Sequence, residues 1–120
     1  MGNLSAPSPA LVARIVQSVD FENRLIGSSL HLRAGVRVVS LYRLEEVFMF
    51  LNKPHPQIEL KKLHAWISTV IKDEELAQGI KQIIAGEGSE MHKMLAARDM
   101  IGMRIIQCRQ PAHGSEKSAV

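Results

Sequence analysis

Hydrophobic and polar residues alternate along this chain with the period of an α-helix in most places and with the period of a β-strand in one. The first helical pattern lies near the start. Ser8 has the side chain of a helix N-cap, and Pro9 fits the first helical position, which needs no N–H donor. One apolar face follows at helical spacing, formed by Leu11, Val12, Ile15, Val16 and Val19. The pattern predicts a helix that begins at Pro9.

The stretch with a two-residue period lies near residues 28–39. Its apolar positions are Leu30, Leu32, Ala34, Val36 and Val38, and polar residues such as Arg33 and Arg37 lie between them. Two structures fit this alternation: a short strand pair that bends at Gly35, or extended backbone that lies against helices. We predict one short extended segment or hairpin near residues 28–39, because a lone hairpin is marginal unless helices cover its apolar face.

Four residues mark the boundaries of the helical patterns that follow. Ser40 is the expected N-cap of a helix that ends at the two prolines of "NKPHP", and Pro56 is expected to start the next helix. Asp73 begins the run "DEEL", which supplies a capping side chain and carboxylates to the positive end of a helix dipole. Ser89 is expected to cap the longest helix, "EMHKMLAARDMIGMRIIQCRQ".

These patterns predict an all-α bundle of four or five helices with the extended segment near residues 28–39. The length of 120 residues fits a single domain over residues 1–120, in which residues 1–7 and 111–120 are expected to be disordered tails. Apolar residues make up 46% of the chain, which is typical of a globular protein. The lone cysteine, Cys108, excludes an intramolecular disulfide and favours a cytoplasmic location, and no apolar run is long enough to span a bilayer.

A basic stretch without acidic residues lies between Glu22 and Glu45, in a chain whose net charge is +3. It contains Arg24, Arg33, Arg37 and Arg43. Two interpretations stay open: a surface that attracts the phosphates of nucleic acid, or four separate solvated arginines on an ordinary protein surface. Nucleic-acid binding through residues 24–43 is therefore the alternative function.

No pattern of residues in the chain predicts catalysis, a metal site or a cofactor. The five histidines are scattered, and no two have the i,i+4 spacing that places both imidazoles on one helical face. His64 lies at the edge of an apolar stripe, and the sequence places no nucleophile or acid to act with it. We expect a protein that is not an enzyme and holds no metal ion or cofactor.

The last helical pattern carries more apolar residues than one buried face requires. Its apolar residues are Met91, Met94, Leu95, Met100, Ile101, Met103, Ile105 and Ile106, and the charged residues Arg98, Asp99, Arg104 and Arg109 occupy the positions that remain. Either this helix is central in the bundle, or a second face of it meets a partner such as another copy of the chain. Methionine side chains suit such adaptable contact surfaces.

The predicted function is therefore a non-catalytic protein interaction or regulatory module that forms a homodimer or binds another protein, without a membrane partner. The expected interface residues are Met91, Met94, Met100, Met103, Ile106 and Trp66. Trp66 is the only tryptophan of the chain, and it either belongs to the core or anchors the interface.

Two segments share features with known sequences. "AGVRVVSLYRLEEV" combines a small residue, Gly and Leu-x-x-Leu entering a helix, and "HAWISTVIKDEELAQGI" combines Trp, an apolar run, Asp and Leu-Ala. Together they resemble an uncharacterised family of small prokaryotic helical domains of unknown function, over about residues 21–109. The resemblance implies a helical fold and a prokaryotic source. The intervening "NKPHPQIELKK" lacks the aromatic and histidine-containing stretch of that family, and no catalytic residue is carried over.

Overall fold

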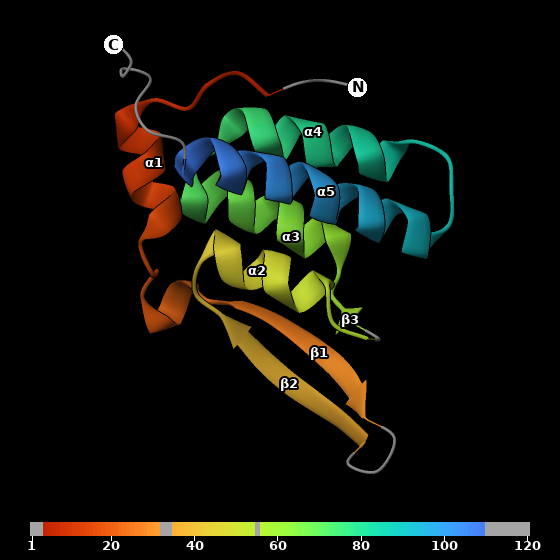
Figure 1. The fold of residues 1–120 in the computed structure, drawn as a ribbon. Coiled ribbons are helices and arrows are strands. Elements are labelled where there is room, and N and C mark those ends of the chain that lie inside the picture. Colours follow the sequence, from red (N-terminus) through yellow and green to blue (C-terminus); the bar gives the residue numbers. More distant parts are fainter. Residues whose placement is uncertain (1–3, 32–34, 55, 110–120) are drawn as a thin grey trace.

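The structure is a computed structural model that describes residues 4–31, 35–54 and 56–109. It shows an α+β fold in which a layer of helices lies above a small sheet (Figure 1). The expectation of an all-α bundle is therefore wrong: a three-stranded antiparallel sheet accompanies the helices.

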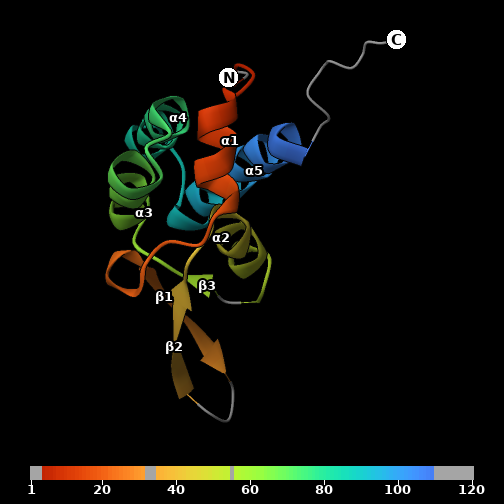
Figure 2. The ribbon, with the colours of Figure 1, turned by 90° about the vertical axis from the view of Figure 1, so that its left-hand side faces the viewer.

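The helices pack around the long C-terminal helix. Their bounds are α1 Pro9–Val16, α2 Leu44–Leu51, α3 Leu60–Trp66, α4 Glu74–Ala85 and α5 Glu90–Arg109, and a short 3-10 turn covers Phe21–Asn23. Helix α5 contacts α1, α2 and α4, and α3 packs against α4 (Figures 1 and 2). Among the described residues, no helix combines the length and the hydropathy needed to cross a membrane.

The sheet has the strand order β2-β1-β3, with β1 Leu25–His31, β2 Gly35–Leu41 and β3 Pro56–Gln57. Strands β1 and β2 pair from Leu25 with Leu41 to His31 with Gly35, so the predicted hairpin exists and extends beyond residues 28–39. Helix α2 packs on one face of the hairpin at the end where Leu25 and Leu41 are buried. Phe50 of α2 lies so close to Gly27 that a Cβ there would be 2.9 Å from the ring.

Three of the predicted helix caps are confirmed. The side-chain oxygens of Ser8, Asp73 and Ser89 each accept the backbone N–H three residues further on, at 3.1 Å in every case. Two other boundaries are wrong. Ser40 lies in β2 and Pro56 lies in β3, so the helices that follow begin later, because both residues are drawn into strand pairing.

The stretch "LHAWISTVIKDEELAQGI" forms a helix, a corner and a second helix. Helix α3 continues as a π-helical segment over Ile67–Ile71, and Lys72 turns the chain with a φ of 64°. Arg14 of α1 stabilises this corner, since its guanidinium donates to the carbonyl oxygens of Ile71 and Lys72 at 3.0 and 3.2 Å. Trp66 is 5% exposed and belongs to the core, and its Nε1 donates to the carbonyl oxygen of Asn23.

Candidate functional site

The inner face of α5 closes the core of the protein. Ala97 and Ile101 are fully buried, and Gly102 lies under the ring of Phe48, where an added Cβ would be 2.7 Å from the nearest ring carbon. A Cβ at this position would force the Phe48 ring to shift, because α2 and α5 pack closely here. Of the eight apolar residues that the sequence places on this helix, Met94, Ile101 and Ile105 are buried within the chain.

Arg104 anchors the same face through a buried cluster of charges. It is 1% exposed, and its five N–H donors make five hydrogen bonds. Two of these bonds reach Asp73, which is also 1% exposed, and another reaches Glu75 at 2.9 Å. Since Asp73 caps α4, this cluster joins the start of α4 to the end of α5.

The first described residues are held by that cluster. The backbone N–H of Ser5 donates to both carboxylate oxygens of Glu75, at 3.0 and 2.9 Å, and the Ser5 hydroxyl donates to the second of them at 2.7 Å. These hydrogen bonds, followed by the nearby guanidinium of Arg104, lower the pKa of Glu75 below its ordinary value. Leu4 is buried, so the part of the predicted N-terminal tail that the structure describes is packed against the helices.

The outer face of α5 presents apolar side chains to solvent. The exposed fractions are 59% for Met91, 36% for Leu95, 40% for Met103 and 59% for Ile106. Leu95, Met103 and Ile106 fall at i, i+8 and i+11, a spacing that places them on one side of a helix. Asp99 lies on the same side and is hydrogen-bonded to Arg98. We call Leu95, Asp99, Met103 and Ile106 the outer stripe.

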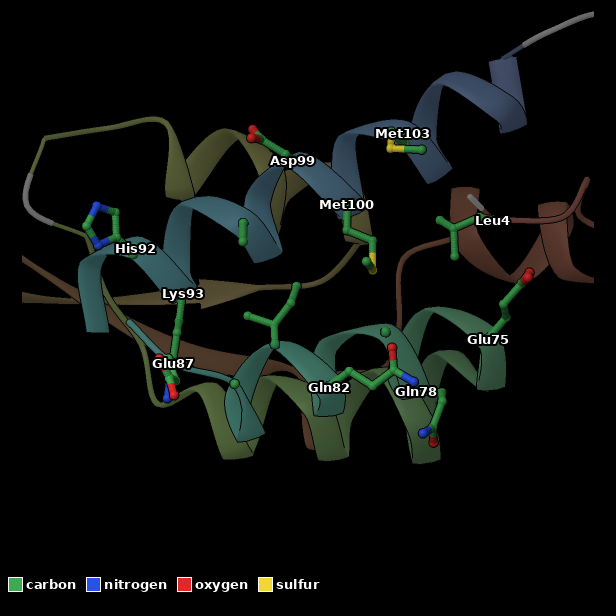
Figure 3. Close-up of a pocket in the computed structure, with 14 residues that line it drawn as sticks. Leu4, Glu75, Gln78, Gln82, Glu87, His92, Lys93, Asp99, Met100 and Met103 are labelled. Atoms are coloured by element: carbon green, nitrogen blue, oxygen red, sulfur yellow. The ribbon is translucent and has the colours of Figure 1, made fainter. Parts of the chain in front are cut away.

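A groove of about 880 Å³ runs beside this stripe, between α4 and α5 (Figure 3). Its apolar wall is formed by Leu4, Gly79, Ile83, Ala96, Met100 and Met103. Figure 3 shows Leu4 and Glu75 near one end of the groove, and Glu87, His92 and Lys93 near the other. Met100 enters the space between the helices because Gly79 has no side chain there; an added Cβ would overlap the sulfur of Met100.

The residues expected at an interface divide into three groups. Met94 and Trp66, at 8% and 5% exposed, are core residues and offer no surface to a partner. Met100 is half-buried in the wall of the groove. Met91, Met103 and Ile106 are exposed on α5. Leu95 is missing from the predicted set, although its spacing of eleven residues from Ile106 would have placed both on one side of the helix.

The four arginines of the basic stretch have different environments. The guanidinium of Arg24 lies 3.6 Å from the centre of the Phe21 ring and donates to the hydroxyl of Ser40. Arg43, the N-cap residue of α2, forms an ion pair with Glu46 of that helix, with 3.6 Å between Nε and Oε2. Arg37 is exposed on β2, and within the described ranges it makes no ion pair. Arg33 lies outside the described residues.

His92, at one end of the groove, and Cys108, away from it near the end of α5, both have structural explanations. The hydroxyl of Ser89 is 3.2 Å from Nδ1 of His92, and the same hydroxyl caps α5 by accepting the N–H of that residue. Burial raises the pKa of the Cys108 thiol, which makes it a poor nucleophile at neutral pH. In the part of the chain that the structure describes, no group of three or more His, Cys, Asp or Glu side chains is arranged to hold a metal ion.

Comparisons with known proteins give no match. No protein-family model, no curated protein and no solved structure is significantly similar to this chain. The resemblance to a family of small prokaryotic domains stays a prediction.

Proposed function

We propose that this chain is a non-catalytic interaction module that forms a homodimer through the outer stripe of α5 and the adjoining groove. The proposal is supported by one observation: the outer stripe and the groove adjoin each other. Met103 belongs to the stripe and also lines the groove, so the exposed apolar side chains and the apolar wall form one surface. Contiguous apolar patches of this kind mark interaction sites on soluble proteins.

The outer stripe is compatible with a copy of itself in the antiparallel direction. When Leu95 of one copy faces Ile106 of the other, the twofold axis repeats that contact, and this register does not set the two Asp99 side chains opposite each other. A symmetric pair therefore buries two leucine–isoleucine contacts without opposing like charges. The antiparallel arrangement also sets the positive end of each helix dipole beside the negative end of the other.

The groove provides the space for the second α5. A helix of 20 residues is about 30 Å long, so α5 of the second copy reaches along the whole length of the 12-residue α4. Its apolar side chains would enter between α4 and α5, where Met100 and Met103 adapt easily to a new neighbour. The four helices of the two copies would then form one bundle.

The required contact area is reasonable for a chain of this size. A stable interface covers roughly 800 Å² on each partner. That is about a tenth of the accessible surface of 7399 Å². We place this homodimer in the cytoplasm, a location that the single, half-buried Cys108 supports because the chain has no second cysteine for an internal disulfide.

Sedimentation velocity across micromolar concentrations tests the proposal. We expect the wild-type chain to shift from monomer to dimer as its concentration rises. Ile106→Glu should remain monomeric, because dimerisation would bury one unpaired carboxylate from each copy against an apolar side chain. Val38→Glu is the matched control. It places the same charge on a residue of the hairpin that is 72% exposed, and it should dimerise like the wild type. A wild-type monomer at every concentration, or an Ile106→Glu dimer, would contradict the proposal.

A further inference from the structure

The hairpin of β1 and β2 carries a second apolar surface, away from α5. Paired residues of antiparallel strands lie on the same face, and the register pairs Ser28 with Val38 and Ile26 with Ser40. Ile26, Val36 and Val38 therefore share the face that α2 does not cover, and they are 43%, 62% and 72% exposed. Figures 1 and 2 show that the hairpin extends beyond the helices, which leaves this face accessible.

Strand β2 is also an edge strand. In the order β2-β1-β3, only one side of β2 is paired, and no strand of the described residues lies against the other side. Half of its backbone N–H and C=O groups therefore point outward, which is the arrangement that a further strand can complete. An element that satisfies these groups must itself be extended.

The side chains of β2 define which sequence such a strand would carry. Val36 and Val38 project to the open face, and apolar residues opposite them would be buried in contact with β-branched neighbours. Arg37 projects to the other face and makes no ion pair in the described part of the chain. A carboxylate opposite it would form a cross-strand pair.

We infer that β2 binds an extended segment of another protein, which adds a fourth strand to the sheet. The segment alternates an apolar, an acidic and an apolar residue, with the acidic side chain facing Arg37 and the apolar ones facing Val36 and Val38. Main-chain hydrogen bonds supply the general affinity, and the alternation supplies the specificity. This surface is separate from the proposed dimer contact on α5.

A second copy and a nucleic acid fit this edge less well. The described strands contain no acidic residue, so pairing of β2 with a strand of another copy would leave Arg37 without an opposite charge. Nucleic acid requires several free cations close together. Arg24 and Arg43, the other described arginines of the basic stretch, are already engaged by Phe21 and Glu46.

Selection from a displayed library of random peptides tests the inference. The wild-type chain should enrich peptides with an apolar–acidic–apolar alternation, and Arg37→Glu should enrich the same alternation with a basic central residue. Val38→Lys should lose the enrichment, because the lysine removes an apolar contact. Lys81→Glu is the matched charge control: it lies on α4, far along the chain from the hairpin, and should select the same peptides as the wild type.

An enriched peptide is then synthesised and its affinity measured by fluorescence anisotropy. Replacing its acidic residue by glutamine should weaken binding by about fivefold to the wild type and should not weaken it to Arg37→Gln. Circular dichroism of each variant checks that the hairpin is intact. Enrichment without an alternating pattern, or an identical selection by Arg37→Glu, would overturn the inference.

Three further measurements distinguish other partners. Disulfide dimers of Val38→Cys would show that a second copy occupies the edge, and binding of labelled random-sequence DNA that Arg37→Glu abolishes would show that nucleic acid does; either result overturns the inference. Ile106→Glu should select the same peptides as the wild type, so failure of the dimer proposal and failure of this one are separate outcomes.

Discussion

The two faces of α5 differ in how far the rest of the chain buries their apolar side chains and pairs their charges. On the inner face, Ile101 is fully buried, and the five donors of Arg104 all have acceptors. On the outer face, Leu95 and Ile106 contact solvent, at 36% and 59% exposed. One helix therefore combines a face that is buried and fully hydrogen-bonded with a face that exposes apolar side chains to solvent. The comparison indicates that the inner face determines the fold and that the outer face is available for a partner.

The same contrast explains where the charges lie. Arg104 is buried because its partners come from three separate places: the N-terminal segment, the cap of α4 and the next turn of α5. Within the described ranges, Asp99, on the outer face, accepts hydrogen bonds from its neighbour Arg98 alone. The charge on the inner face joins three parts of the chain, whereas the charge on the outer face is exposed to solvent.

The largest expected effect concerns the buried ion pair. Arg104→Met leaves Asp73 uncompensated in the core and should lower the free energy of unfolding by about 3–5 kcal/mol. Urea denaturation measures the change. Arg98→Met, which removes the half-exposed pair with Asp99, is the control and should cost less than about 1 kcal/mol. Equal losses of unfolding free energy for the two variants would contradict the view that the inner face contributes more to stability than the outer face.

A smaller loss is expected where α5 meets α2. Gly102→Ala should lower the free energy of unfolding by about 1–2 kcal/mol, because crowding against Phe48 outweighs the gain in helix propensity. The second substitution Phe48→Leu should restore part of the loss by removing the crowded ring. An increase in the free energy of unfolding for Gly102→Ala would show that Phe48 does not pack closely against α5 at this position.

The Glu75 carboxylate should make a modest, pH-dependent contribution. Its pKa is lowered in the folded protein, so its stabilisation is complete above the ordinary value of about 4.5 and is lost as the pH falls through the lowered pKa. Glu75→Gln should therefore reduce the urea midpoint at neutral pH, and the difference from the wild type should shrink in acid. The effect is limited because this side chain is 41% exposed. A difference that grows in acid would contradict the hydrogen bonds from Ser5.

The smallest effect on folding is expected on the outer face. Ile106→Ala should change the free energy of unfolding of the monomer by less than about 0.5 kcal/mol, since this side chain is 59% exposed and alanine favours the helix. The measurement is urea denaturation at a concentration low enough to keep the chain monomeric. A loss as large as that of a core residue would show that the outer stripe contributes to the fold of one chain.

Helix caps and apolar periodicity predicted most of the helical structure. The side chains of Ser8, Asp73 and Ser89 each accept a hydrogen bond from the backbone N–H three residues further on. Because this contact is local, the sequence pattern was sufficient to predict it. The sheet was harder to predict. Strand β3 contains two residues, Pro56 and Gln57, and it exists only because β1 is beside it.

The candidate site was predicted in part. Periodicity identified a surplus of apolar residues on the last helix, and Met103 and Ile106 are indeed exposed. It did not show which side faces the core, so Met94 was assigned to the surface although it is 8% exposed. The burial of Arg104 was also missed, because its acceptors are up to 99 residues away in the sequence. The groove depends on how α4 and α5 pack and has no local signal.

Disulfide cross-linking tests the central claim, that a second copy covers the outer stripe in the antiparallel direction. Leu95→Cys with Ile106→Cys, in a Cys108→Ser background, should give covalent dimers on mild oxidation. The two positions are about 16 Å apart along one helix, too far for a bond within one chain. Leu95→Cys alone should stay monomeric. Failure of the double variant to cross-link, or dimers of Leu95→Cys alone, would contradict the antiparallel pair.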